Sequence, residues 1–374
     1  MKFVVSSTEL LSHLQAVSKV ISTKNSMPIL DNYLFKLSNG DLTITASDLE
    51  STMITSFGLD NADGDGTIAV PAKILNDTLK EFPEQPLSFL IDLDSSMIDI
   101  LSDSGKFSIP GMNGEDYPVV PSIAENAHTI ELNSEILLKG ITKTLFATAD
   151  DELRPVMNGI FIELAENSIT FVASDAHKLV RYRRTDVASL AQAGFILPKK
   201  PANLIKNIVD KIDSKVILKF DSKNAYVETR GFKLICRLIE GEYPKYENVI
   251  PFSSPNKMVV ERSSFINTLK RVSVFSSQAS NLIKLKISNN LVVVSAQDLD
   301  FSISAYERSS CNYEGEDMEI GFKSVFLVEI LNNLSGNEVV FEMNDPGRAG
   351  IILPVEKYNV HEDVLMLIMP MMVS

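Results

Sequence analysis

The sequence lacks most of the residues and patterns on which catalysis or membrane insertion depends. It has no tryptophan, two cysteines and four histidines in 374 residues. No apolar run is long enough to cross a bilayer, and the N-terminus turns polar without forming the apolar core of a signal peptide. We therefore predict a soluble, cytoplasmic protein without a membrane partner, in which Cys236 and Cys311 are ordinary thiols and form no disulfide.

Known catalytic motifs are missing as well. The sequence contains no GxxxxGK[ST] phosphate loop, HExxH metal motif or GxSxG nucleophile elbow, and no cysteine pair with metal-binding spacing. We accordingly predict no catalytic site, no metal and no cofactor. One enzymatic alternative stays open, because His177 lies two residues after Asp175 and the pair could belong to an unrecognised site.

The sequence does contain one pattern three times. In each copy a turn rich in asparagine is followed by an alternating apolar run and then by an aspartate, and the aspartates are 127 and 123 residues apart. This period is far longer than that of a solenoid repeat, so each copy is a whole domain. The three aspartates are Asp48, Asp175 and Asp298, and the predicted domains are 1–124, 125–252 and 253–374.

Each copy predicts two helices and several strands. Apolar residues with helical spacing define the six helices, and alternating runs such as 41–47 and 290–296 predict half-buried strands joined by tight turns. The aspartates that end these runs are predicted turn formers. The fold class is therefore α+β, with helices on one face of antiparallel sheets. The predicted helices are 8–21, 71–82, 133–147, 198–211, 263–275 and 321–334.

The distribution of charge differs from the overall balance. The net charge is −14, yet six segments that follow the predicted helices closely together carry +8 and the other residues −22; these segments are 9–24, 72–82, 134–147, 198–211, 262–272 and 322–334. A basic excess on equivalent elements indicates a surface for nucleic-acid phosphates that is bound without sequence readout. The alternative is an ordinary solvated helix face.

Three groups of residues carry a resemblance to a known family. "MPILDNYLFKLSNGDLTITASDLE" (27–50), "NGIFIELAENSITFVASDAHKL" (158–179), and "MEIGF" (318–322) together with "MPM" (369–371) closely resemble the bacterial sliding clamp, the beta subunit of DNA polymerase III. The resemblance covers essentially the whole chain. It implies the DNA clamp fold and a polymerase processivity factor, in which two chains join head to tail as a ring, with helices lining the hole for duplex DNA and sheets outside.

The resemblance also implies partners and site residues. The expected partners are duplex DNA, a second copy of the chain, the replicative DNA polymerase, an ATP-driven clamp loader, and other replication and repair proteins that carry clamp-binding peptides. The expected peptide-binding residues are Met157, Ser174, Ala176, His177, Lys178, Leu179, Pro244, Val249, Phe326, Leu367, Ile368, Met369, Pro370 and Met371. The expected dimer contacts are Phe107, Ile109, Val274 and Phe275.

The expected DNA-facing residues have two sources. The resemblance implies four of them: Lys24, Lys73, Lys199 and Lys200. Position on the predicted helices adds five more: Lys139, Lys143, Lys206, Lys270 and Arg271.

Several residues depart from the family pattern and leave alternatives open. The family commonly has glycine at Ala176, arginine at Lys178, and basic residues at Asn248 and Met372, so peptide preference is open. The C-terminal "VLMLIMPM" could be only a last core strand filled by methionines. A repeat scaffold that forms no ring and binds only proteins is a further alternative.

Overall fold

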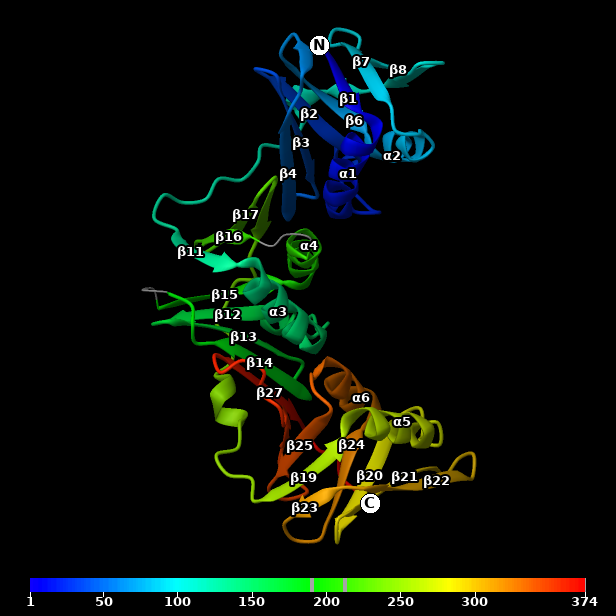
Figure 1. Ribbon diagram of the computed structural model, residues 1–374, viewed down its shortest axis with the longest axis vertical. Coiled ribbons are helices and arrows are strands. Elements are labelled where there is room, and N and C mark those ends of the chain that lie inside the picture. The colour runs from blue at the N-terminus through cyan, green and yellow to red at the C-terminus, as the bar shows by residue number, and fades with distance from the viewer. Residues whose placement is uncertain (189–191, 211–213, 374) are drawn as a thin grey trace. The chain divides into compact units, whose positions relative to one another are not determined.

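The computed structural model describes residues 1–188, 192–210 and 214–373. These residues contain six α-helices, two in each repeat, and strands that pair only in antiparallel fashion (Figure 1). All six predicted helices are confirmed, although Lys211 at the end of the fourth lies outside the described residues. The helices are α1 (Ser7–Val17), α2 (Ala72–Lys80), α3 (Ser134–Thr144), α4 (Lys199–Val209), α5 (Arg262–Ser273) and α6 (Ser324–Asn333).

The strands form four sheets. The five-stranded sheet has the order β5 (Asn61–Asp63), β1 (Lys2–Ser6), β7 (Pro86–Asp92), β8 (Met97–Leu101), β9 (Lys106–Pro110). The four-stranded sheet has the order β22 (Ile303–Ser310), β21 (Leu291–Asp298), β20 (Leu282–Ser288), β24 (Met318–Lys323). The first nine-stranded sheet has the order β10 (Met112–Asn113), β6 (Gly66–Pro71), β2 (Asn32–Ser38), β3 (Asp41–Ser47), β4 (Ser51–Gly58), β18 (Phe232–Arg237), β17 (Asn224–Thr229), β16 (Lys215–Phe220), β11 (His128–Asn133). The second has the order β15 (Ala193–Pro198), β12 (Gly159–Ala165), β13 (Ser168–Ser174), β14 (Lys178–Arg184), β27 (Glu362–Ile368), β26 (Gly350–Pro354), β25 (Glu338–Met343), β19 (Asn256–Glu261), β23 (Asn312–Glu314).

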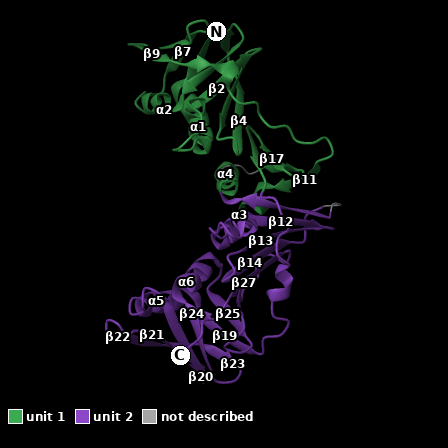
Figure 2. Cartoon of the chain, turned by 180° about the vertical axis from the view of Figure 1, so that it is seen from behind, with its two compact units in different colours: residues 1–138, 200–238 green, residues 139–199, 239–374 purple. Residues whose placement is uncertain are grey.

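Each nine-stranded sheet joins two consecutive repeats. Strand β4 of the first repeat pairs with β18 of the second, and β14 of the second pairs with β27 of the third. As a consequence the chain forms two compact units, 1–138 with 200–238 and 139–199 with 239–374, whose boundary passes through the middle repeat (Figure 2). The backbone hydrogen bonds across each junction make each half of this repeat part of its neighbour's sheet.

The helices cover one face of the strands through periodic apolar residues. In α1, Leu10, Leu14 and Val17 follow the spacing i, i+4, i+7 and are buried. They complete a core that contains Phe3 stacked on Phe89, with ring centroids 4.8 Å apart. Each such side chain contributes about 1.5–3 kcal/mol through burial. Helix α1 packs beside α2 and α5 beside α6, as predicted for an α+β repeat (Figure 1).

The repeated aspartates form the same turn three times. Asp48 Oδ1 accepts hydrogen bonds from the backbone amides of Glu50 and Ser51, at 3.0 and 2.6 Å. Asp175 Oδ1 accepts from the amides two and three residues further on, at 2.9 and 2.8 Å, and Asp298 Oδ1 does so at 3.0 and 3.4 Å. The predicted role of these carboxylates as turn formers is confirmed, which accounts for their recurrence without a catalytic role.

The two cysteines are free thiols, as predicted. Cys236 is buried in β18, and burial raises the pKa of its thiol to about 12. This thiol therefore stays protonated and packs as a small apolar residue. In the part of the chain that the structure describes, no helix combines the length and the apolar character needed to span a membrane.

A histidine lies at the junction of the first and second repeats. The His13 ring stacks on Phe57 at 4.3 Å between centroids and lies 5.9 Å from Phe232 of the second repeat. Its Nδ1 is 2.7 Å from the Thr55 hydroxyl, which donates to the Gly231 carbonyl. Burial lowers the pKa of His13, although Glu9 acts in the opposite direction.

Acidification should therefore weaken this junction. A folded-state pKa below the unfolded value means that the unfolded chain binds more protons, so stability falls as the pH drops below about 6.5. Thermal unfolding between pH 7.5 and 5 should show a smaller loss of melting temperature in His13→Gln than in the parent protein. His128→Gln, which alters a histidine at another site, is the control. Equal losses in His13→Gln and the parent would exclude His13 as the titrating group.

Candidate functional site

Strand pairing between the second and third repeats brings most of the expected peptide-binding residues together. Strand β14 pairs with β27, so that Leu179 lies opposite Leu367 and Lys178 opposite Ile368. Leu179 and Leu367 are almost fully buried and share an apolar cluster with Tyr246 from the segment between the repeats. These leucines form a floor and offer little surface of their own.

An aromatic pair lies at the end of this strand pair, next to a different apolar cluster. The His177 ring stacks on Phe326 of α6, with centroids 5.7 Å apart and an interplanar angle of 22°. The Met369 amide donates to the His177 carbonyl at 2.8 Å, which fixes the start of the C-terminal tail next to the ring. We call His177, Phe326 and Met369 the His177 surface. Phe326 packs against the cluster that contains Val180 and Met366, whereas Leu179 and Leu367 belong to the separate cluster with Tyr246.

Lys178 is held by neighbouring groups rather than presented to solvent. Its ammonium lies 2.7 Å from an Asp175 carboxylate oxygen and 3.2 Å from Glu329, and the side chain is 5% exposed. It also lies 4.2 Å from the centre of the Phe326 ring, with Lys323 4.8 Å from the same ring. Lys178 therefore shapes the surface by supporting Phe326, with its charge already compensated.

Ala176 occupies a backbone conformation that favours glycine. Its φ is +73°, and Leu49, the equivalent residue of the first repeat, has a φ of +75°. A side chain in this region costs about 1–2 kcal/mol, which the surrounding turn must offset. The glycine common in the family at this position is thus explained by the Asp175 turn.

The remaining expected peptide-binding residues have different environments. Ser174 is buried and donates its hydroxyl to the Lys178 carbonyl at 2.9 Å, while Met157, Pro244 and Val249 lie at the surface or half-buried. Met157 ends the 3₁₀ turn η5 (Pro155–Met157), and Val249 ends η6 (Tyr246–Val249). The Met157 backbone hydrogen-bonds to Ala149 and Arg154, at 2.9 Å each, and not to the residues of the His177 surface.

The C-terminal segment divides into a core part and a surface part. Leu367 and Ile368 are buried in strand β27, as the alternative of a last core strand predicts. Met369 is 39% exposed, Pro370 is half-buried, and the Met371 amide donates to the Gly321 carbonyl at 2.8 Å. The tail from Met369 onward is therefore accessible, whereas the two preceding residues are structural.

Sequence reasoning missed Lys323, Glu329 and the two tyrosines of the segment between the repeats. Tyr243 stacks on Phe161 with centroids 5.0 Å apart, and the Tyr246 hydroxyl donates to Glu163 at 3.0 Å. The repeated Tyr-Pro of "GEDYP" and "GEYP" was the available signal for Tyr243. Glu329 gave no such signal, because its partner Lys178 is 151 residues away along the chain, and Lys323 gave none because the role of its neighbour Phe326 depends on contacts with the middle repeat.

The expected DNA-facing cations fall into two groups. Within the described ranges, the ammonium groups of Lys24, Lys73, Lys206 and Lys270 have no ion-pair or hydrogen-bond partner. The other five bind groups of the protein itself. These contacts are Lys139 with Glu362 (3.6 Å), Lys143 with the Asn333 carbonyl (2.6 Å), Lys199 with Asp150 (2.8 Å), Lys200 with Asp48 (2.5 Å) and Arg271 with Glu307 (2.5 Å).

The expected dimer contacts lie at sheet edges or at a helix end. Phe107 is 40% exposed on edge strand β9 and packs edge-to-face on Phe82, at 5.2 Å between centroids. Val274 and Phe275 follow α5 and are exposed. Ile109 is different, because its side chain is buried within its own chain and only its strand backbone lies at the edge.

Neither a metal site nor a catalytic pair is found in the described chain. No group of three histidine, cysteine or acidic side chains is arranged to hold a metal ion in this part of the molecule. Asp175 is occupied by its turn and by Lys178, and the His177 ring is occupied by Phe326. Three repeats of helices over antiparallel sheet, joined by strand pairing at each repeat junction, have the architecture of a DNA clamp.

Comparison with known proteins gives the family. Three models of the DNA polymerase III beta subunit match the chain: the N-terminal domain at 1–121, the central domain at 131–245 and the C-terminal domain at 247–372. The chain therefore belongs to the DNA polymerase III beta subunit family. Its function is that of a sliding-clamp processivity factor in DNA replication, a polymerase accessory subunit without catalytic activity of its own.

Individual relatives match over nearly their full length. The beta sliding clamp of Vibrio cholerae is 26% identical over 357 residues, covering 95% of this chain and 96% of the relative. That of Synechocystis sp. is 29% identical over 380 residues, with the same coverage. The Thermotoga maritima beta subunit structure has a TM-score of 0.91 at 26% identity, and a Pseudomonas aeruginosa clamp has 0.94 at 24%, each covering 100% of both chains.

Proposed function

We propose that two copies of this chain form a closed ring around duplex DNA. The observation that carries this proposal is an equivalence between strands. Strands β4 and β14, each following the aspartate turn, pair with β18 and β27 of the next repeat, while the equivalent strands β22 and β9 are unpaired sheet edges. A third junction of the same kind, made between two chains, closes a ring after two subunits.

The internal junctions also give the register of this seam. Thr52 lies opposite Ile235 and Leu179 opposite Leu367. In the third repeat, the residue that lies at the same place after the aspartate turn as Thr52 and Leu179 is Ser304. In the first repeat, the residue that corresponds to Ile235 and Leu367, counted from the first helix through the paired strands, is Ser108. The proposed seam therefore pairs Ser304 with Ser108 of the partner subunit, and exposed apolar residues support it from both sides. These are Phe107, Val274, Phe275, Leu299, Phe301 and Ile303.

A charged contact follows from the same equivalence. Lys73 at the start of α2 corresponds to Lys200 at the start of α4, and Asp298 corresponds to Asp48. Lys200 binds Asp48 within the chain. We propose the matching pair between Lys73 and Asp298 of the partner subunit, so that Lys73 belongs to the seam rather than to the DNA-facing surface.

The DNA-facing surface of the ring is supported by the distribution of charge. Helices with a net positive charge inside an otherwise acidic protein hold phosphates without reading bases, and water-mediated contacts permit sliding. Lys24, Lys206 and Lys270 supply one unpaired cation in each repeat, and we propose them as principal phosphate contacts.

Exchanging Lys24, Lys206 and Lys270 together for glutamate should reduce loading and retention on circular DNA. Three lost phosphate contacts in each of two subunits predict a retention loss of at least tenfold at about 100 mM salt, with a flatter salt dependence. Counting clamps on nicked circular DNA by gel filtration measures this effect. Because a ring slides off free ends, retention of the parent protein should disappear after the circle is linearised.

A triple exchange of lysines on strands rather than helices, Lys36, Lys219 and Lys257 to glutamate, is the control and should leave retention nearly unchanged. Equal retention of all three proteins would contradict the proposed lining. Retention of the parent protein that survives linearisation would contradict the ring and favour a scaffold without one.

We further propose that the His177 surface binds short linear peptides of the replicative polymerase, the clamp loader and other replication and repair proteins. An accessible methionine tail beside an aromatic pair suits a hydrophobic anchor. We also propose repeat boundaries near residues 124 and 252. A cytoplasmic location is proposed as well, because the two free thiols suit a reducing compartment.

A further inference from the structure

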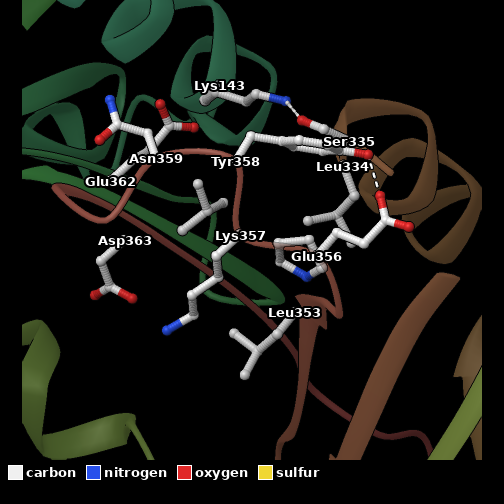
Figure 3. Close-up of a pocket in the computed structure, with 12 residues that line it drawn as sticks. Lys143, Leu334, Ser335, Leu353, Glu356, Lys357, Tyr358, Asn359, Glu362 and Asp363 are labelled. Atoms are coloured by element: carbon white, nitrogen blue, oxygen red, sulfur yellow. Dashed lines mark hydrogen bonds between the residues drawn. The ribbon is translucent and has the colours of Figure 1, made fainter. Parts of the chain in front are cut away.

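Two lysines of the middle repeat bind backbone carbonyls at helix ends in the neighbouring repeats. Lys143 projects from α3, and its ammonium donates to the carbonyl of Asn333, the last residue of α6, at 2.6 Å. It also donates to the Ser335 hydroxyl at 3.0 Å (Figure 3). Both partners belong to the third repeat and lie in the same compact unit as Lys143.

Lys200 makes the corresponding contact with the first repeat. From the start of α4 its ammonium donates to the carbonyl of Val20 at 2.7 Å, and Val20 ends the 3₁₀ helix η1 (Ser18–Val20) that follows α1. The same ammonium binds the carboxylate of Asp48, the turn aspartate of that repeat. The middle repeat thus places a lysine on a backbone carbonyl at a helix end of each neighbour.

Helix ends provide a physical reason for these contacts. The last carbonyls of a helix have no partner within the helix and carry partial negative charge, so a nearby cation stabilises them. Helix α6 has no basic residue in its own last turn. Lys143 supplies the missing cation from a different repeat, which joins the two repeats as well as capping the helix.

The surroundings of Lys143 restrict its access to a phosphate. Its side chain lines a cavity of about 80 Å³ together with Leu334, Ser335, Leu353 and Tyr358 (Figure 3). Burial lowers the pKa of this lysine, with Glu362 acting in the opposite direction. An ammonium that is partly desolvated and already bound to a carbonyl and a hydroxyl would lose those bonds by turning toward DNA.

We propose that Lys143 and Lys200 are positioning residues that fix the angle between neighbouring repeats, in place of the phosphate-binding role predicted for them from the sequence. A fixed angle at each internal junction is what brings β9 and β22 of two chains together. This consequence for ring closure rests on the proposed function, whereas the contacts themselves are independent of it.

The test substitutes Lys143→Met, which keeps most of the side-chain length and removes the hydrogen bonds, with Lys143→Arg as the conservative variant. Loss of the charged hydrogen bonds should lower the melting temperature by about 3–6 °C. It should also speed amide hydrogen exchange in the last turn of α6 by about tenfold. Lys143→Arg should recover at least half of both effects, because a cation returns to the helix end.

A second variant keeps the test informative if Lys143→Met does not fold. Ser335→Ala removes one acceptor only, and it should shift exchange at the end of α6 in the same direction by a smaller factor. At the other junction, Lys200→Met and Asp48→Asn should each lower the melting temperature. Asparagine retains the Oδ1 acceptor of the Asp48 turn, so its effect reports the ion pair.

Salt dependence separates positioning from phosphate binding. Lys270→Met, the control, should flatten the salt dependence of retention on circular DNA without changing exchange in α6. Lys143→Met should leave that salt dependence unchanged. The proposal is overturned if Lys143→Met flattens it as Lys270→Met does while melting and exchange stay at parent values. If the melting and exchange effects are as expected but the parent protein is not retained on circular DNA, the positioning role stands and the proposed ring is contradicted.

Discussion

Replacing Val274 and Phe275 together with aspartate is expected to give folded monomers of 41.3 kDa in place of a dimer of about twice that mass. Val274 is 73% exposed and Phe275 37% exposed in the chain, so their loss removes little internal packing. In a seam they would be apolar anchors worth about 2 kcal/mol each, which weakens each of the two seams of the ring roughly a thousandfold. Sedimentation at micromolar concentration measures the mass, and retention on circular DNA should be lost with the dimer.

The control for this substitution is Val119→Asp, an exposed valine outside the proposed seam. It should remain dimeric. A Val274 and Phe275 variant that sediments as a dimer would mean that the seam lies elsewhere.

The register of the seam can be examined separately with cysteines. In a Cys311→Ser background, Ser108→Cys with Ser304→Cys should form a covalent dimer under mild oxidation, because directly opposed residues of antiparallel strands lie within disulfide range. Ser108→Cys with Tyr306→Cys, displaced by two residues on the same face, should cross-link poorly. Efficient cross-linking of the displaced pair alone would mean a different register.

Deletion of Met369 to Ser374 is expected to abolish peptide binding while leaving a dimer that encircles DNA. The deletion removes the residue bonded to the His177 carbonyl and the tail paired with Gly321, but none of the strand residues of β27. A peptide with one or two apolar anchors should bind the parent protein with micromolar affinity, and the deletion should weaken it at least a hundredfold. Calorimetry with a C-terminal peptide of the replicative polymerase gives this value.

Point variants define the surface more finely. His177→Ala should weaken the same peptide about three- to tenfold, since it removes one ring of a stacked pair. Met372→Ala, at a residue that is 90% exposed beyond the tail contacts, and His128→Ala in the other compact unit should have little effect. Full affinity in the truncated dimer would assign the peptide site to another part of the molecule.

Periodic and repeated features of the fold could be predicted from the sequence. The six helices were located to within a few residues because their apolar positions recur with helical spacing, as in α1. The three aspartate turns were predicted because the Oδ1 atoms of Asp48, Asp175 and Asp298 accept hydrogen bonds from amides that follow them closely in the chain. The absence of catalytic motifs predicted a protein without a catalytic site, and membership of a family of polymerase accessory subunits agrees with that prediction.

The candidate site was predicted only in outline. The "SDAHKL" segment and the methionine tail identified two of its sides, but the burial of Leu367 and Ile368 could not be read from "VLMLIMPM". Whether an apolar residue is buried or exposed depends on which strand lies beside it. The pairing of β14 with β27 decides this, between segments about 190 residues apart.

The sequence by itself determined the repeat, the helices, the turns and the excess of lysine on helical segments, because each depends on neighbours in the chain or on composition. Only the tertiary structure decided what each lysine does. Lys143 and Lys206 have similar helical settings in the sequence, yet the first reaches the Asn333 carbonyl and the second binds no group of the described protein. The reason is physical: a lysine carries the same charge everywhere, but its partner is whichever carbonyl, carboxylate or phosphate the packing of distant segments brings within about 3 Å.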